Sequence, residues 1–254
     1  GEPEPFARAK AVHDWVADRI TYDVAALTGK RPPQDAETVF ASRRAVCAGY
    51  SKLFEAVAKA AGLEAMYIVG DAKGANGEVD GAGHAWNVVK LGDAWHLVDT
   101  TWDSGSVGEG GFKKRYTTDY FLTPPEIFRA THLPKEEKWQ LVSPISRGEF
   151  MRMPQLGPDF YKRGMKLRAP ERSQTTVAGE GEIVVDNPAG QFLLVSYTPK
   201  TGGASTRCEV SGTSTITARC AFAAEGEYRV LLFGAAERYT TYWSMGELQF
   251  LSKP

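Results

Sequence analysis

The first sixty residues carry apolar side chains at the three- and four-residue spacing of amphipathic helices. The apolar stripe of the first predicted helix consists of Phe6, Ala9, Val12, Val16 and Ile20. Asp35 is placed to cap a second, short helix. A third helix is predicted from Cys47 or Ala48 to about Ala61, where Gly62 stops it.

From residue 63 onwards the pattern becomes that of β-strands. The first three strands are predicted at 63–70, 84–91 and 94–102. Gly92-Asp93 is a short turn between the last two of them, which predicts an antiparallel hairpin. Helices followed by a sheet built this way indicate an α+β fold for the first part of the chain.

From about residue 159, short β segments follow one another, separated by turn residues at fairly regular intervals. They are predicted at 182–185, 191–198, 206–210, 214–222, 227–233 and 239–250. This spacing is typical of an all-β sandwich of immunoglobulin-like type. The sequence therefore predicts two domains, an α+β core at 5–158 and a β-sandwich at 159–254.

The composition narrows the partners of this protein. The 254 residues include 30 Lys and Arg against 31 Asp and Glu, for a net charge of −1, which argues against a nucleic-acid partner. No apolar run approaches the roughly 18 residues that a membrane span needs. The opening Gly-Glu-Pro-Glu-Pro has neither the basic nor the apolar region of a signal peptide, a start that a mature secreted or periplasmic protein shares.

Cys47 is the first candidate for chemistry, because it lies where a long helix is predicted to begin. Unpaired backbone N–H groups and the helix dipole stabilise a thiolate at that position, and the thiolate is the nucleophilic form of cysteine. Gly49, two residues later, leaves space for a substrate close to the backbone. The alternative is a small buried cysteine without chemistry.

The predicted hairpin adds a histidine and an aspartate to this candidate site. If Leu91 faces Ala94 across the turn, His84 and Asp99 are diagonal neighbours on one face, about 7–8 Å apart at the backbone. The same count puts His96 on the other face. His84 would then accept the thiol proton, and Asp99 would hold the imidazole tautomer and stabilise its charged form.

The sequence gives weaker signals for the oxyanion donors and for the substrate cleft. The backbone N–H of Cys47 is expected to donate to the oxyanion, with Gln34 and Trp15 as candidates for a second donor. Trp86 and Trp102 are candidates for the walls of a substrate cleft, although aromatic residues in hairpins more often pack in the core.

The remaining histidines and cysteines do not suggest a metal site. His13 is expected at the polar rim of the first helix, and His132 in a structural loop. There is no Cys-x-x-Cys or His-x-x-x-His pair, no acidic cluster for calcium and no nucleotide fingerprint, so we expect no metal and no cofactor.

Cys208 and Cys220 lie on neighbouring predicted strands, either as a disulfide or as free buried thiols. A simple hairpin turning at 211–213 would put Cys208 opposite Ile216, so a bridge would have to span two sheets. A disulfide would favour a secreted or periplasmic protein.

Three blocks of the sequence resemble the transglutaminase-like superfamily, in the family order Cys, His, Asp. They run from Val46 to Phe54, from Gly83 to Val89 and from Trp95 to Asp103. More narrowly, the kyphoscoliosis peptidase branch is resembled by Ile20-Thr21-Tyr22-Asp23, Tyr120-Phe121-Leu122, His132-Leu133-Pro134 and Trp139-Gln140-Leu141.

The resemblance implies a papain-like core with an acyl-transfer triad of Cys47, His84 and Asp99. It implies a thioacyl-enzyme formed on a protein or peptide substrate and, by the narrower resemblance, its hydrolysis. The enzymatic alternative is crosslinking or deamidation of glutamine. The alternative from another class is an adhesion or scaffold module with a vestigial triad, in which the sandwich engages a protein partner.

Overall fold

The computed structural model describes residues 4–74, 77–79 and 81–254, and these fall into two compact units. The first unit lies within residues 1–72 and 79–144, and the second lies within residues 73–78 and 145–254. Among the described residues, no helix is both long and apolar enough to cross a membrane.

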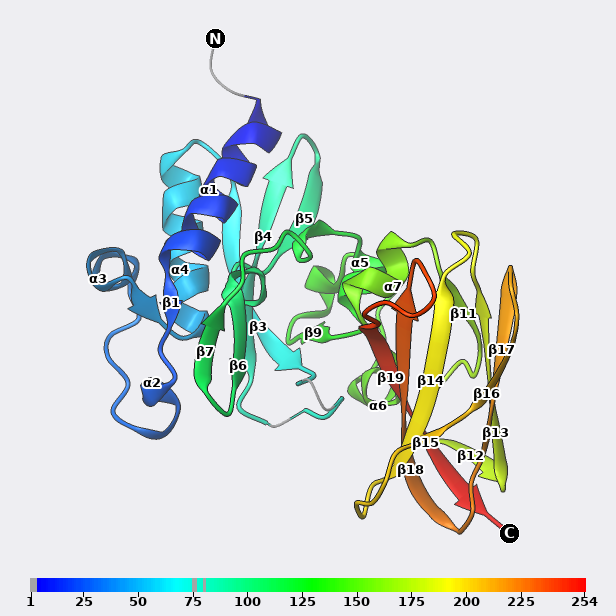
Figure 1. Cartoon of the computed structure of the whole chain (residues 1–254). Helices are drawn as coiled ribbons and strands as arrows, with labels where there is room; N and C mark the ends of the chain where they lie inside the picture. Colours follow the sequence, from blue (N-terminus) through cyan, green and yellow to red (C-terminus); the bar gives the residue numbers. More distant parts are fainter. Residues whose placement is uncertain (1–3, 75–76, 80) are drawn as a thin grey trace. The chain divides into compact units, whose positions relative to one another are not determined.

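Helices α1 and α4 of the first unit lie on one side of its central sheet (Figure 1). The helices are α1 (Pro5–Arg19), α2 (Ala25–Thr28), α3 (Ala36–Ser42), α4 (Cys47–Ala60) and α5 (Pro125–Phe128), with two 3-10 turns, Trp102–Ser104 and Glu137–Gln140. The predicted Asp35 cap is confirmed, since its side chain accepts from the Thr38 N–H. The helix predicted from Cys47 or Ala48 to about Ala61 runs from Cys47 to Ala60.

The central sheet of the first unit has five strands in the order β8-β5-β4-β3-β9. Their bounds are Phe121–Thr123 (β8), Ala94–Val98 (β5), His84–Leu91 (β4), Ala65–Ala72 (β3) and His132–Pro134 (β9). Two small two-stranded sheets complete the unit, Thr21–Tyr22 (β1) with Arg44–Ala45 (β2), and Gly105–Gly108 (β6) with Gly111–Lys114 (β7).

Helix α4 is anchored to this sheet by both apolar and polar contacts. Its buried Leu53 and Phe54 belong to the core that the helices share with the sheet. The buried Asn87 of β4 donates to the Ser51 carbonyl of the helix at 2.9 Å and to the Met66 carbonyl of β3 at 3.2 Å. These bonds fix the height of α4 along the sheet, and with it the position of the helix start.

The predicted hairpin register is confirmed. Leu91 pairs with Ala94, and the ladder of β4 and β5 runs without a shift to Asn87 opposite Val98. The third strand was predicted to reach residue 102 but ends at Val98. It ends there because the Asp99 carboxylate accepts from the backbone of the next residues and turns the chain into the first 3-10 turn.

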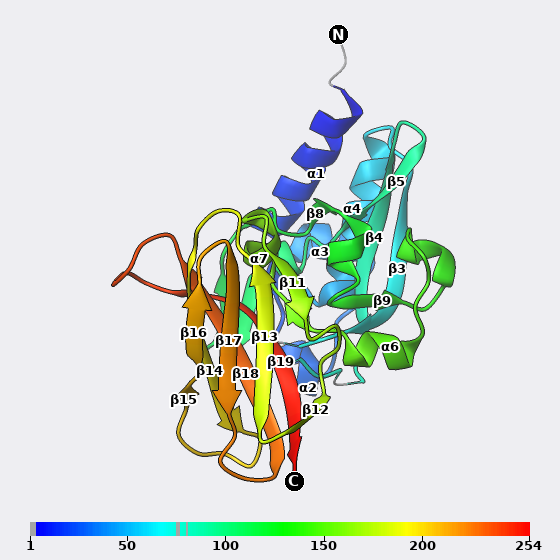
Figure 2. The same ribbon diagram turned by 90° about the vertical axis from the view of Figure 1, so that its right-hand side faces the viewer.

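The second unit is a sandwich of two mainly antiparallel sheets, whose layers are seen edge-on in Figure 1 and face-on in Figure 2. One sheet has the order β10-β19-β18-β14-β15, with β12 beside β19, and the other has the order β11-β13-β17-β16. Apolar side chains from both layers form one core, including Val185 and Ile183 of one sheet and Val195, Val230 and Leu232 of the other.

The elements of this unit agree with the predicted spacing of short strands. They are α6 (Arg147–Arg152), β10 (Gln155–Leu156), α7 (Pro158–Lys162), β11 (Lys166–Ala169), β12 (Thr175–Ala178), β13 (Glu180–Asp186), β14 (Phe192–Pro199), β15 (Thr206–Arg207), β16 (Glu209–Gly212), β17 (Thr215–Ala221), β18 (Gly226–Ala235) and β19 (Trp243–Lys253).

The second unit begins earlier than the predicted boundary between residues 158 and 159. Strand β10 pairs with β19, with Leu156 opposite Gly246. Phe150 is fully buried, and the Met153 carbonyl accepts from the Lys73 ammonium at 2.7 Å. Residues from 145 onwards therefore pack with the sandwich, which a composition change alone does not reveal.

Cys208 and Cys220 form a disulfide, with their Cα atoms 4.4 Å apart. The predicted hairpin across 211–213 is wrong. The pairing of β16 with β17 puts Gly212 opposite Ile216, so continuation of the ladder brings Cys208 opposite Cys220 rather than opposite Ile216. The bridge therefore needs no long span between sheets.

Candidate active site

Cys47 is the first residue of helix α4 and the free cysteine of the chain. The residue before it, Val46, offers the helix no side-chain cap. The Gly49 N–H donates to the Val46 carbonyl at 2.9 Å, so the N–H groups that the first turn can offer to an anion or an oxyanion are those of Cys47 and Ala48. The hydroxyl of Ser51 donates to the Cys47 carbonyl at 2.9 Å, which holds this end of the helix in place.

His84 is the first residue of strand β4, and Asp99 directly follows strand β5. His84 Nε2 lies 2.7 Å from Asp99 Oδ2, with the carboxylate fully buried and the imidazole side chain 10% exposed. The second ring nitrogen, Nδ1, is left for the thiol of Cys47, and the thiol and the imidazole act on each other's pKa. The hairpin register thus brings together the residues that the sequence pattern selected.

The Asp99 carboxylate is satisfied on both oxygens. Oδ1 accepts the backbone N–H groups of Thr101 at 2.8 Å and Trp102 at 3.2 Å. Oδ2 accepts from His84 and, at 3.1 Å, from Nε2 of His132. Burial by itself raises the pKa of this carboxyl, but the charge of His84 and the two histidine hydrogen bonds hold it well below its usual range. Asp99 therefore stays ionised.

The pKa of the Cys47 thiol and the pKa of the His84 imidazole shift in opposite directions. Burial disfavours the charged form of His84, but the Asp99 charge and hydrogen bond outweigh it and raise the pKa of His84 to about 10. Burial likewise raises the pKa of Cys47, but the hydrogen bond and charge of His84 and the backbone N–H of Ala85 lower it overall. These directions favour a thiolate beside an imidazolium at neutral pH.

His132 is part of this network, which the sequence analysis did not foresee. It lies in strand β9, fully buried, with Nδ1 2.9 Å from the Thr131 hydroxyl. Burial lowers the pKa of His132 to about 4, so the ring is neutral at pH 7. A neutral ring has one N–H, and a lone pair facing the Asp99 carboxylate would be repelled. The proton therefore lies on Nε2, and Nδ1 is the acceptor that faces the Thr131 hydroxyl, which also lies 3.3 Å from the Phe128 carbonyl.

Rings surround this second histidine. The ring centroids of Phe128, Trp102 and Trp86 lie 4.0, 4.3 and 5.1 Å from that of His132. His132 reaches Asp99 because β9 pairs with β3, with His132 opposite Ala72. Sequence analysis expected His132 in a structural loop, because no local sequence pattern indicates a pairing across some sixty residues. Its place in a block of family resemblance was the one available signal, and it was not used.

His84, Asp99 and His132 are also a set of side chains with metal-ligand spacing, since their ligand atoms lie within 4.8 Å of one another. Both Nε2 atoms, however, face the same carboxylate oxygen at hydrogen-bonding distance. The hydrogen bonds satisfy all three side chains without an ion, and we treat the set as a hydrogen-bond network.

Two of the three predicted substrate-binding residues are corrected by the structure. A Cβ added to Gly49 would lie 2.6 Å from both the Ala45 Cβ and the Gln34 Oε1, so this glycine permits close packing of the protein rather than access of a substrate. Trp86 is fully buried and belongs to an interior cluster with Phe128. Trp102 is half-buried with its ring 5.4 Å from that of His84, and remains a candidate.

The two proposed second donors make contacts of their own. Gln34 Nε2 donates to the Pro32 carbonyl, and its Oε1 accepts from the N–H of Val46, both at 3.0 Å. Gln34 thus holds the residue just before Cys47. Trp15 stacks on Phe40 and packs against Arg43.

His13 lies in the interior rather than at a polar rim. Its side chain is fully buried, and Nε2 lies 2.9 Å from Oδ2 of the equally buried Asp103. Asp103 also accepts from the Thr117 hydroxyl at 2.6 Å and from the N–H of Tyr120. The first unit therefore contains a second histidine–aspartate pair, which connects helix α1 to the chain just beyond Asp99.

Comparison with known proteins relates these residues to a family. Residues 1–100, which include Cys47, His84 and Asp99, match the model of the transglutaminase-like superfamily. Kyphoscoliosis peptidase of Homo sapiens and that of Mus musculus are each 35% identical over 200 residues, covering 74% of this chain. The chain spans only 30% of the length of these two relatives.

Two further similarities are more distant. Hillarin of Drosophila melanogaster is 29% identical over 136 residues, covering 46% of this chain and 16% of that protein. A crystal structure described as that of a TGase is 25% identical, covers 45% of this chain and 31% of that chain, and superposes with a TM-score of 0.33.

Proposed function

Since this chain belongs to the transglutaminase-like superfamily, with its similarity to the kyphoscoliosis peptidases, we propose that it is a thiol-dependent acyl-transfer enzyme. Cys47, His84 and Asp99 are its catalytic triad. The observation that carries this proposal is the short Asp99–His84 hydrogen bond beside the free cysteine, together with a lowered pKa of Cys47 and a raised pKa of His84.

The first half of the reaction forms a thioester. The Cys47 thiolate attacks the carbonyl carbon of an amide, and the backbone N–H groups at the start of α4 stabilise the oxyanion. As the C–N bond breaks, the imidazolium of His84 gives its proton to the leaving amine. Asp99 keeps the ring oriented throughout, because its carboxylate is fixed by four donors.

The second half releases the acyl group. Neutral His84 takes a proton from the incoming nucleophile, which attacks the thioester carbon, and the Cys47 thiolate leaves. With water, the product is a carboxylic acid, and the enzyme is a peptidase or amidohydrolase. With a lysine amine, the product is a crosslink. We favour water and a protein or peptide substrate, on the similarity to the kyphoscoliosis peptidases.

The test that requires no known substrate is alkylation of Cys47 by iodoacetamide, measured by intact mass over roughly pH 4 to 9. The two other cysteines are bonded to each other, so the labelled thiol is unambiguous. We expect rapid labelling near pH 6 in the wild type and slow labelling in His84→Ala. His96→Ala is the matched control, because His96 lies on the same hairpin opposite Val89, outside the network.

Equal labelling rates of Cys47 in the wild type and in His84→Ala would contradict the catalytic proposal and favour a scaffold protein with a vestigial triad. If the thiol is activated, peptide mixtures incubated with and without a fluorescent primary amine separate the two enzymatic functions. Cleavage that the amine does not suppress supports hydrolysis, whereas incorporation of the amine into glutamine side chains supports crosslinking.

A further inference from the structure

The chain changes sheets in the second unit and leaves part of an edge strand uncovered. Strand β15 pairs with β14 only at Ser196 and Tyr197. At Cys208, which donates its N–H to the Val195 carbonyl at 2.9 Å, the chain crosses to the other sheet and continues as β16 beside β17. Among the described residues, no strand lies beside the first part of β14 on this side.

The backbone of Leu193 is directed toward this uncovered edge. Strand β14 pairs with β18 without a register shift, so the residues that face the opposite edge alternate along it. Val195 faces β15, as its bond to Cys208 shows, and Leu193, two residues earlier, faces the same way. Its N–H and C=O are therefore placed to pair with an added strand.

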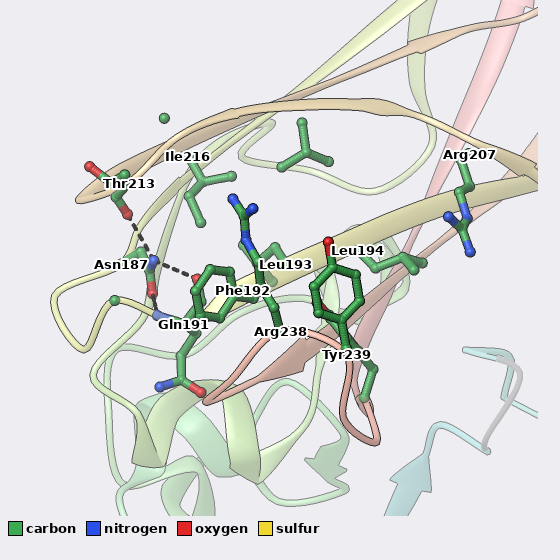
Figure 3. A pocket seen from close by; sticks show the side chains of 14 residues that line it. Asn187, Gln191, Phe192, Leu193, Leu194, Arg207, Thr213, Ile216, Arg238 and Tyr239 are labelled. Carbon is green, nitrogen blue, oxygen red and sulfur yellow. Dashed lines mark hydrogen bonds between the residues drawn. The ribbon is translucent and has the colours of Figure 1, made fainter.

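A pocket of about 690 Å³ opens beside this edge, within the range of ~300–1,000 Å³ typical of ligand sites. Phe192, Leu193 and Leu194 of β14 line one side, and Val210 and Ile216 of the other sheet line the facing side. Figure 3 shows Arg238 and Tyr239, from the loop between β18 and β19, over this strand. The pocket thus offers apolar walls next to free backbone groups.

The pocket is also positively charged. Fourteen residues line it, and its only charged side chains are Arg207 and Arg238. Both arginines are exposed, and the Arg238 guanidinium lies 5.2 Å from the centroid of the Phe192 ring. Since no carboxylate of the lining balances these two charges, the site favours an anionic ligand.

We propose that this edge of the second unit binds an extended peptide rich in acidic and apolar residues, which adds a strand to β14. The backbone of Leu193 pairs with the peptide, apolar side chains enter the pocket, and acidic side chains meet Arg207 and Arg238. This site lies within the second unit and does not depend on the triad. It gives the sandwich a recognition role separate from the acyl-transfer chemistry.

The experiment uses the full chain carrying Cys47→Ala, so that no peptide is consumed. The probes are two fluorescein-labelled heptapeptides, one alternating Glu with Val and one alternating Lys with Val. We expect fluorescence anisotropy to show binding of the Glu peptide only, weakening as salt is added. In the ¹⁵N-labelled protein, hydrogen exchange at the Leu193 amide should slow by about ten-fold or more when the Glu peptide is bound.

Arg207→Glu/Arg238→Glu should weaken binding of the Glu peptide by about ten-fold or more. The matched control, Lys166→Glu/Lys253→Glu, makes the same change in net charge at exposed positions outside the pocket lining and should leave affinity within about two-fold. Three results would overturn the proposal. The first is no binding of the Glu peptide to the Cys47→Ala chain, and the second is equally tight binding of that peptide to both double variants. The third is binding that slows hydrogen exchange at other amides and not at Leu193. A sulfated oligosaccharide that binds where the Glu peptide does not would also overturn it.

Discussion

The two units differ in their histidines and free thiols. All four histidines and the free cysteine lie in the first unit, and its fully buried Asp99 and Asp103 each accept hydrogen bonds from histidine. The second unit has no histidine, and its two cysteines are joined in a disulfide. Its sandwich core is apolar, and its pocket presents fixed arginine charges.

This difference separates chemistry from recognition. A proton-transfer site needs groups whose charge changes near pH 7, and burial with partners tunes their pKa values. A peptide-binding edge needs a rigid backbone and charges that stay constant. The first unit fits the first requirement and the second unit fits the second, so variants in one unit should leave the readout of the other unchanged.

The largest effect is expected when the two buried aspartates of the first unit are compared. Asp99→Asn removes the charge that orients and stabilises the His84 imidazolium, and should lower turnover by roughly 10³–10⁴-fold. Asp103→Asn disturbs the His13 pair, which does not touch the thiol. It should lower the free energy of unfolding by about 1–3 kcal/mol with little change in the turnover of folded protein.

Steady-state kinetics and urea denaturation of both variants make this comparison. Asp99 and Asp103 are four residues apart, equally buried and hydrogen-bonded to histidine, so each variant is the control for the other. Comparable losses of turnover in the two would mean that neither aspartate has a specific role in the reaction.

The next effect concerns the second unit alone. Replacing both cysteines, Cys208→Ser/Cys220→Ser, opens a loop with a sequence separation of 12 residues and should lower the free energy of unfolding by about 2–4 kcal/mol. Alkylation of Cys47 should keep the rate and pH dependence of the wild type. A slower reaction of Cys47 at full folding would show that the two units are energetically coupled at the active site.

The helices and the hairpin could be predicted because local rules determine them. The capping aspartate, the helix that starts at Cys47 and the two-residue turn at Gly92-Asp93 each follow from a few neighbouring residues. The hairpin register then selected His84 and rejected His96 without any knowledge of the tertiary structure. In the second unit, by contrast, the turn after Cys208 was misplaced, and the disulfide pairing could not be deduced from it.

Long-range packing explains what the sequence did not reveal about the site. Gly49 and Trp86 have the residue types of a substrate cleft, but contacts with Gln34 and with Phe128 put them in the interior. His132 joins the network only because a three-residue strand pairs with β3. Such pairings leave no periodicity in the sequence, so a single chain without relatives does not disclose them.

The pH dependence of stability distinguishes a thiolate–imidazolium pair from a neutral one. The folded protein holds a proton on His84 up to about pH 10, whereas the unfolded chain releases it near its ordinary value of 6.5. The stabilisation of the fold by this protonated His84 is complete below pH 6.5 and is lost as the pH rises toward 10. Cys47 acts in the opposite direction, because its lowered pKa makes the folded thiol release its proton before the unfolded one does.

The two contributions oppose each other in the wild type, so its free energy of unfolding should fall less between about pH 6.5 and 9 than the His84 contribution alone would make it fall. Cys47→Ser lacks the opposing contribution of the thiol. Its stability should fall over the same interval by at least about 1.4 kcal/mol, the equivalent of one pKa unit. Urea denaturation at a series of pH values measures this. Parallel curves for the two proteins would contradict an ion pair at the site.

The smallest effect tests His132 as a positioning residue. His132→Phe removes one of the two donors to Asp99 Oδ2, and should lower turnover by about ten-fold, or ~1.4 kcal/mol. Without that donor the carboxylate charge acts more strongly on His84, so the alkaline limb of the pH–rate profile should move to higher pH. His132→Gln keeps an N–H donor within reach of Asp99 and should restore both properties.

This pair of variants separates positioning from packing. His132 is packed among aromatic rings, so a purely structural role would make phenylalanine the better replacement and glutamine the worse one. Urea denaturation is expected to show that order for stability, with His132→Phe at least as stable as His132→Gln. Turnover and the alkaline limb should show the reverse order. If turnover follows stability instead, the hydrogen bond to Asp99 does not contribute to the reaction.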